Sequence, residues 1–232
     1  MISIKNLQFK YPRSDFSLRL PELEVAKGQK VAFVGPSGCG KTTLLNLIAG
    51  ITTPDSGNVL TAGENVGLMS SAKRRDFRIS NIGLVFQQFE LIDYLDLKSN
   101  ILLPFAINRS LHVSKKVETR AINLANEMGL GGKLKRFPQQ LSQGEKQRCA
   151  ICRALVTEPQ LILADEPTGN LDPKNKQVIM DLMFKQTGRF GQTLVMVTHD
   201  MSILGGMDRT IDFEQFRHDA SGTIGATTEA SS

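Results

Sequence analysis

Residues 31–50, VAFVGPSGCGKTTLLNLIAG, decide the fold of this chain. The stretch opens as an apolar strand, breaks into glycines around a single lysine and then resumes a helical apolar pattern. Its middle part, GPSGCGKT at 35–42, matches GxxxxGK[ST] with a strand before it and a helix after it. Glycines let several backbone N–H groups point at one anion, and the helix N-terminus adds a positive dipole. The pattern therefore predicts a loop that holds the phosphates of a nucleoside triphosphate.

Two side chains of this loop suit a magnesium-bound nucleotide. Lys41 is expected to reach the terminal phosphates, and Thr42 to offer its hydroxyl to Mg²⁺. The other residues expected to bind the nucleotide are Gly35, Ser37, Gly38, Cys39, Gly40 and Thr43. Cys39 is interpreted as a small packing residue, with a redox role as the alternative. A bulky adduct on its thiol is expected to crowd the phosphates, so alkylation should inhibit and ATP should protect.

A second motif, LILADEP at 161–167, supplies the carboxylates that nucleotide hydrolysis needs. The apolar run predicts a buried strand, and Asp165 at its end can hold Mg²⁺. The adjacent Glu166 can polarise the attacking water. Such a pair can also mark nothing more than a strand end that meets a loop. The phosphate loop in the same chain favours the functional interpretation.

The hydrophobic patterns around these motifs predict an α/β fold, and the phosphate-loop motif indicates that its core is that of a P-loop NTPase. Alternating apolar and polar residues at 2–11 and 16–20 are typical of antiparallel strands with one solvated face. Continuous apolar runs at 31–34, 161–164 and 194–197 instead suit central strands of a largely parallel sheet that is covered on both faces. We therefore expect an antiparallel β region at the N-terminus beside a mixed, largely parallel sheet.

A helical lobe is expected to interrupt this core. Apolar residues recur at helical spacing through 117–128. We expect the lobe over residues 88–155, inserted in a single domain whose ATP-binding core comprises 1–87 and 156–218. The tail at 219–232 is small and polar without periodicity, and it is expected to be flexible.

Composition favours a cytoplasmic globular protein. Lys and Arg number 28 against 23 Asp and Glu, and a net charge of +5 suits anionic partners such as nucleotides, lipid head groups or nucleic acid. No apolar run approaches the roughly 20 residues that span a bilayer, and the N-terminus has no export signal. Three cysteines form no disulfide framework, as in a reducing cytoplasm. Cys149 and Cys152 form a CxxC without two further ligands nearby, so zinc is not expected.

The segment LSQGEKQR at 141–148 closely resembles the signature sequence of ABC-type ATPases. This resemblance covers nearly the whole chain, and other family elements follow in order. Gln87 resembles the Q-loop glutamine, GNLD at 169–172 resembles the D-loop, and His199 resembles the switch histidine. Tyr11 stands where the family places an aromatic residue that stacks on adenine.

The resemblance implies a mechanism in which two chains pair head to tail around two ATP molecules. Ser142 and the backbone near Gly144 would meet the γ-phosphate of the ATP that the partner chain binds. Gln87 would touch Mg²⁺ and the attacking water, His199 would hold the γ-phosphate side of the transition state, and Asp172 would communicate across the dimer. The implied catalytic residues are Lys41, Gln87, Glu166 and His199. The implied magnesium ligands are Thr42, Gln87 and Asp165.

Residues 63–104 resemble the ATPases of the lipoprotein-release and macrolide-efflux class. Such ATPases drive integral membrane permeases, so the chain is expected at the cytoplasmic face of the inner membrane, held there by its permease. FELIDYL at 89–95 offers apolar anchors between the acids Glu90 and Asp93, and a permease helix is expected to dock there. The alternative is that these apolar residues pack the helical lobe. Gln143 stands where the family often has glycine, which leaves the detailed signature contact open.

Two other functions within the same family must be weighed. DNA-acting members separate the phosphate loop from the signature with a long coiled coil, whereas residues 41–141 hold no sustained heptads. Ribosome-acting members carry two such domains, whereas this chain has one set of motifs, so no nucleic acid partner is expected. An ATPase of a cell-division signalling complex also pairs with a permease-like partner, and the sequence does not separate this function from export. The sequence names neither the cargo nor the permease.

Overall fold

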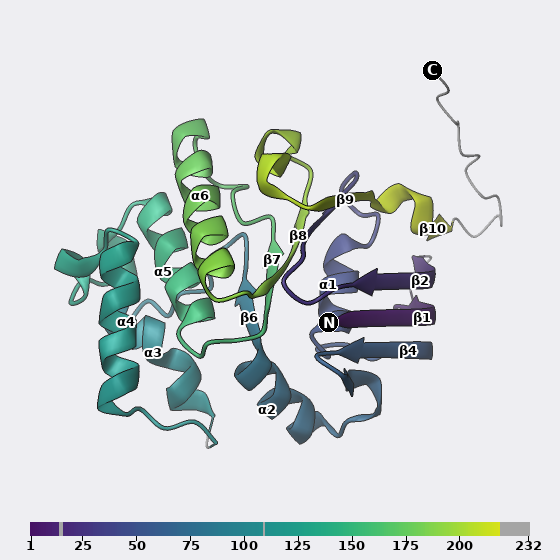
Figure 1. Cartoon of the computed structure of the whole chain (residues 1–232), viewed down its shortest axis with the longest axis horizontal. Coiled ribbons are helices and arrows are strands. Elements are labelled where there is room, and N and C mark those ends of the chain that lie inside the picture. The colour runs from purple at the N-terminus through teal and green to yellow at the C-terminus, as the bar shows by residue number, and fades with distance from the viewer. Residues whose placement is uncertain (14–15, 109, 219–232) are drawn as a thin grey trace.

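The computed structural model describes residues 1–13, 16–108 and 110–218. An antiparallel sheet lies at one end of the molecule, a parallel sheet in the middle and a group of helices at the other end (Figure 1). This arrangement confirms the predicted α/β fold class. The tail predicted to be flexible, 219–232, falls outside the described residues.

The antiparallel sheet confirms the strands predicted near the N-terminus. Its strands, in spatial order, are β10 Arg217–His218, β2 Ser17–Val25, β1 Ile2–Lys10, β4 Ser56–Thr61 and β5 Glu64–Asn65. Within β1, Asn6 has a φ of 51°, and the register with β4 shifts on either side of it. A bulge of this kind changes which face alternate side chains meet, so that Ile4 and Leu7 are both buried. Gly57 is required opposite the bulge, since a Cβ there would lie 2.3 Å from the Asn6 carbonyl oxygen.

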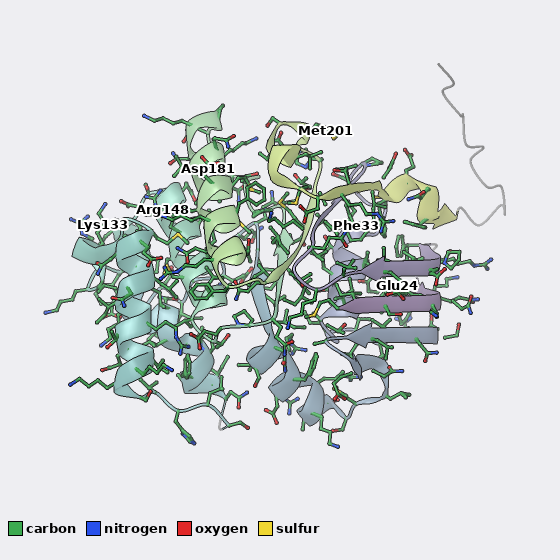
Figure 2. The ribbon with its side chains drawn as sticks, in the orientation of Figure 1. Glu24, Phe33, Lys133, Arg148, Asp181 and Met201 are labelled. Atoms are coloured by element: carbon green, nitrogen blue, oxygen red, sulfur yellow. The ribbon has the colours of Figure 1, made fainter. Side chains whose placement is uncertain are left out.

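The parallel sheet is buried on both faces, as the continuous apolar runs predict. Its strands, in spatial order, are β6 Ile82–Val85, β7 Leu161–Asp165, β8 Thr193–Thr198, β3 Lys30–Val34 and β9 Arg209–Asp212. Along β8, Val195 and Val197 join a core shared with the antiparallel sheet, whereas Leu194 and Met196 join a core shared with the helices. Phe33 of β3 lies in the first of these cores, edge-on to the ring of Phe213 (Figure 2).

The described residues form six α-helices and five short 3-10 helices. The α-helices are α1 Lys41–Ile48, α2 Ser71–Asn81, α3 Leu97–Ile107, α4 Lys115–Glu127, α5 Gln143–Leu155 and α6 Pro173–Arg189. The 3-10 helices are Val66–Leu68, Gly131–Lys133, Pro138–Gln140, Met201–Gly206 and Phe213–Phe216. Helix α1 contacts both β4 and β7, so it fills the space between the two sheets. None of the helices described is long and apolar enough to span a membrane.

Helices α3, α4 and α5 occupy the region predicted as a helical lobe. Helix α4 confirms the helical pattern predicted through 117–128. Helix α5 contacts α3 and α4, and it also contacts β6 and α6. One hydrophobic core therefore joins these helices to the parallel sheet. The limits of the lobe, 88–155, stay a prediction.

The strand order explains how distant motifs come together. Strands β3, β7 and β8 lie side by side and run in the same direction, so their carboxyl ends meet at one edge of the sheet. The phosphate loop follows β3, Asp165 ends β7, and His199 follows β8. Ligands of open α/β sheets bind at such an edge.

Candidate functional site

A cleft of about 520 Å³ opens at this edge of the parallel sheet. It is lined by Tyr11, Phe16, Ser37, Gly38, Gly40, Lys41, Thr42, Thr43, Gln87, Asp165, Glu166 and His199. The residues come from the start of α1, the end of β7 and the loops that follow β1, β3, β6, β7 and β8. Of this lining, Phe16 alone was not predicted from the sequence. The fold thus gathers most of the predicted nucleotide, metal and catalytic residues around one hollow.

The phosphate loop has the backbone that its glycines predict. Gly35, Gly38 and Gly40 have φ values of 149°, 82° and 105°, which side-chain-bearing residues rarely adopt. The buried ammonium of Lys41 donates to the carbonyl oxygens of Gly35 at 2.7 Å and Pro36 at 2.8 Å. These bonds brace the loop from inside.

The N-terminus of α1 suits an anion for a further reason. Among the α-helices of the described residues, α2 to α6 each begin with a side chain that accepts a backbone N–H, as Ser70 does for α2 and Ser142 for α5. Helix α1 instead begins after Gly40, which offers no such cap. Its first N–H groups therefore face the cleft uncapped by a side chain, as binding of phosphate at a helix N-terminus requires.

Thr42 and Asp165 form an oxygen pair that fits a magnesium ion. The Thr42 hydroxyl donates to Asp165 Oδ1 at 3.2 Å. Burial raises the pKa of Asp165, the neighbouring Glu166 raises it further, and the Thr42 hydrogen bond opposes the rise. A carboxylate in this situation gains from a nearby cation, and hydroxyl and carboxylate oxygens are ligands that Mg²⁺ prefers. The donor set thus fits the predicted metal.

Glu166 and His199 were predicted separately, and the structure brings them into direct contact. His199 Nδ1 lies 2.8 Å from Glu166 Oε1, and the Thr198 hydroxyl donates to Glu166 Oε2 at 3.2 Å. Glu166 has a φ of 45°, and its N–H donates to the Val197 carbonyl of the adjacent strand. A strained backbone of this kind persists only where neighbouring contacts hold it. These contacts fix the carboxylate at the floor of the cleft.

Gln87 meets the loop that follows Glu166. The side-chain amide of Asn170 donates to the Gln87 carbonyl at 2.9 Å. Gly169 leaves space for Gln87, since a Cβ there would lie 2.8 Å from Gln87 Nε2. Sequence reasoning missed this contact between the Q-loop and D-loop segments, although Asn170 lies inside the GNLD motif.

Two aromatic side chains, Tyr11 and Phe16, line the cleft beside the phosphate loop. The Tyr11 hydroxyl lies 3.3 Å from Thr43 Oγ1, and its ring packs edge-on to Phe9. The ring of Phe16 lies 6.0 Å from that of Tyr11, and its edge covers Gly40 so closely that a Cβ there would clash. Phe16 follows Tyr11 by five positions in the sequence, and this aromatic spacing was the available signal for it.

Three predicted nucleotide residues lie away from the phosphate loop, in two neighbouring helix starts. Ser142 caps α5 and Asp172 caps α6, and neither lines the hollow. Asn175 joins the two starts, because its amide donates to Asp172 Oδ2 at 2.5 Å and its Oδ1 would lie 3.0 Å from a Cβ on Gly144. Ser142, Gly144 and Asp172 therefore form a second cluster, separate from the phosphate loop of the same chain.

Cys39 belongs to the phosphate loop, but its side chain points into the protein. The residue is 1% exposed and joins the core between the sheets. Its sulfur lies 3.7 Å from Lys41 Nζ. This burial supports the interpretation of Cys39 as a packing residue.

The chain resembles known proteins along most of its length. The family model described as ABC transporter matches residues 18–169. The lipoprotein-releasing system ATP-binding protein LolD of Bacteroides fragilis is 42% identical over 82% of this chain and 87% of its own. LolD of Pseudomonas syringae pv. tomato is 39% identical over 92% of this chain and 95% of its own. A solved dimeric, post-hydrolysis state of the ATP-binding cassette MJ0796 bound to ADP and Pi is 32% identical, with a TM-score of 0.81 over 92% of this chain and 95% of that one.

Proposed function

The chain belongs to the ABC transporter family and is an ATPase, and from this premise we propose that it hydrolyses ATP as a head-to-tail dimer that drives a membrane permease. The observation that carries the proposal is the division of the site into two clusters. The cleft holds the phosphate loop, Asp165 and Glu166, whereas Ser142 and Asp172 lie apart from it. In a twofold dimer, the Ser142 and Asp172 cluster of each chain can lie over the cleft of the other chain, because the interface is the same from both sides.

Each residue of the cleft would have a separate role in the cleavage of the terminal phosphate of ATP. Lys41 and the N-terminus of α1 would hold the phosphates, and Thr42 with Asp165 and Gln87 would hold Mg²⁺. The metal would neutralise charge that develops on the phosphate oxygens. Glu166 would accept a proton from the water as its oxygen attacks the γ-phosphorus and the bond to the ADP oxygen breaks. His199, already in contact with Glu166, would hold that carboxylate in place and donate to the γ-phosphate.

A groove of about 500 Å³, which shares no lining residue with the cleft, is the proposed docking site of the permease. Helix α2, strand β6, the Q-loop segment and helix α3 line it, and Glu90 lies at its wall. The expectation that FELIDYL supplies the anchors is only partly met. Phe89 is buried in the protein, and Asp93 is absent from the groove lining, while Pro104 and Ile107 of α3 supply apolar surface.

The charge of this groove is mainly positive. Arg75, Arg78 and Arg153 line it. Arg78 donates to the carbonyl oxygens of Ala49 and Gly50, and its pKa is lowered by burial and by the neighbouring Arg74 and Arg75, as expected where cations crowd together. The docking segment of the permease should therefore be an apolar helix that carries an acidic residue.

The names of the relatives support lipoprotein release as the transport class, in preference to cell-division signalling. We place the chain at the cytoplasmic face of the inner membrane, bound to its permease, and propose no nucleic acid partner. The substrate class rests on these relatives alone, whereas ATP hydrolysis also rests on the geometry of the cleft.

Co-purification from membranes tests the proposed permease. The tagged chain, expressed in its native cells, should bring down one integral membrane permease from detergent-solubilised membranes. Arg75→Glu, at an exposed position of the groove, should reduce recovery about tenfold with the ATPase of the isolated chain unchanged. Lys116→Glu on α4, outside the groove, is the matched control and should have no effect. A parent chain recovered without any membrane partner would refute the transport function.

A further inference from the structure

An ion pair outside the cleft links the two loops on which the proposed mechanism depends. Lys176 Nζ lies 2.5 Å from Asp200 Oδ2, and the two side chains are 26% and 18% exposed. Lys176 belongs to α6, and Asp200 begins the 3-10 helix Met201–Gly206. Both side chains are mostly shielded from water, which makes the pair stronger than a fully exposed one and makes the loss of one partner costly.

On one side, the ion pair is tied to the D-loop. Asp172 caps α6, and its carbonyl oxygen accepts the Lys176 N–H at 3.0 Å. Lys176 therefore stands about one helical turn after the residue expected to face the partner chain. A movement of Asp172 would carry Lys176 with it, because both belong to the same rigid turn.

On the other side, the ion pair is tied to the catalytic carboxylate. Asp200 directly follows His199, and its N–H donates to the Thr198 hydroxyl at 3.0 Å. That hydroxyl and the His199 ring both contact Glu166. The Asp200 carboxylate also accepts the N–H and hydroxyl of Ser202. Residues 198–200 thus connect Glu166 to the ion pair.

The electrostatics agree with a carboxylate that stays charged. The pKa of Asp200 is lowered to about 2, chiefly by the Lys176 hydrogen bond and then by that of Ser202, against the opposing effect of burial. Lys176 is the sole cation within ion-pair distance of Asp200 among the described residues. Removing Lys176 would leave Ser202 as the remaining side-chain partner.

We propose that Lys176 is a positioning residue for ATP hydrolysis, which acts through Asp200 to hold His199 against Glu166. Because Asp172 lies one turn away, the same contact transmits the arrangement of the dimer interface to His199. This inference rests on the proposed function, since it takes the roles of His199 and Asp172 from it. A purely structural ion pair between α6 and the following loop is the alternative.

A double-mutant cycle on kcat distinguishes a positioning role of Lys176 from a purely structural ion pair. Lys176→Met should lower kcat about tenfold with KM for ATP within about twofold of the parent, and it should lower kcat little further in the His199→Ala background. Lys176→Arg keeps the ion pair and should retain kcat. Lys98→Met, which removes the Lys98–Glu118 ion pair between α3 and α4, is the matched control and should leave kcat unchanged. An equal loss of kcat in both backgrounds would overturn the inference.

If His199→Ala proves inactive, the double-mutant cycle cannot be measured, and the ring resonances of His199 provide the readout instead. The chain has three histidines, so the ring resonances of His199 can be assigned by comparison with His199→Ala. In Lys176→Met these resonances should move toward their position in Glu166→Gln, because the contact with the carboxylate loosens. Unchanged resonances would overturn the inference. A near-normal kcat in His199→Ala alone would instead refute the catalytic role proposed for His199.

Discussion

In the proposed mechanism, Glu166 is the residue on which hydrolysis depends most directly. Glu166→Gln keeps the shape of the side chain and leaves the phosphate loop untouched, but it removes the carboxylate proposed to accept the water proton. We expect kcat to fall by about 10²-fold or more with ATP binding retained. Steady-state ATPase assays and size-exclusion chromatography with ATP should show an inactive, ATP-bound dimer. Near-normal turnover would show that another residue is the base.

Cys39 shows how a residue prediction changes with burial. The sequence suggested a thiol that a maleimide could reach, but the sulfur lies in the core and all three cysteines are buried. Burial also raises the pKa of Cys149 to about 12, so its reactive thiolate is scarce.

We therefore expect slow maleimide labelling of the folded chain and rapid labelling in denaturant, measured by intact mass. Cys39→Ser should retain kcat, because a hydroxyl of similar size can occupy the same position. Rapid modification of Cys39 in the folded protein, with loss of ATPase and protection by ATP, would restore the earlier hypothesis.

At this scale, residues inside a contiguous motif were predictable and residues joined by the fold were not. Lys41 and Thr42 follow from a fixed local spacing that phosphate binding imposes. The contact of Glu166 with His199 depends on β7 and β8 being neighbours, which neither segment specifies alone. Phe16 covers Gly40 and Asn170 donates to Gln87 in the same way, through contacts between segments that are distant in sequence.

Among the elements, the start of α5 carries the signature segment. The side chains of Ser142 and Glu145 each cap the backbone N–H of the other residue. Ser142 Oγ accepts the Glu145 N–H, and Glu145 Oε2 accepts the Ser142 N–H at 2.8 Å. Glu145 also pairs with Lys133, which Figure 2 places at the helical end of the molecule. The Lys133 hydrogen bond is the main cause of the lowered pKa of Glu145, and the cap adds to it.

Glu145→Ala should loosen this start and destabilise the protein by about 1 kcal/mol. Glu145→Gln keeps the cap, so it should fall between the parent and the alanine variant in thermal unfolding. Because the pKa of Glu145 is lowered on folding, its contribution is present above the unfolded pKa and is lost as pH falls through the folded pKa. The gap in Tm between parent and Glu145→Gln should therefore close in acid. A gap independent of pH would contradict this origin.

The elements themselves were predicted where their periodicity was clear. Helix α4 and the three buried strands follow from apolar spacing. Helix α2 was not predicted, because its basic residues read as a solvated surface and none of its residues is buried. Its Arg75 and Arg78 nevertheless line the groove, which depends on β6 and α3 lying beside them.

For the whole molecule, the sequence predicted two kinds of sheet but not their strand order. The order β6-β7-β8-β3-β9 pairs strands that are far apart along the chain, and it decides which motifs share the cleft. Likewise, only family resemblance predicted which residues would contact the ATP bound by a second copy or the second copy itself. The separation of Ser142 and Asp172 from the cleft gives that expectation a geometric basis.

Mixing two inactive variants tests whether an active site needs two chains. Lys41→Met disables the phosphate loop, and Ser142→Arg blocks the signature segment, so each homodimer should be inactive. A heterodimer of the two holds one intact site if the signature acts on the partner's ATP, because both lesions then fall in the other site. A one-to-one mixture should regain about a quarter of the parent activity, since half the dimers are mixed and each has one of two sites.

The chain with both substitutions is the matched control for this mixture. Its heterodimer with the parent carries one lesion in each site, so these dimers should be inactive and only parent homodimers should turn over. If the signature instead served the phosphate loop of its own chain, both results would reverse: the two single variants would stay inactive when mixed, and the parent subunit would remain active beside the doubly substituted one. ATPase measured against mixing ratio distinguishes the two arrangements, because the mixture of single variants gains activity only if the signature acts on the partner's ATP.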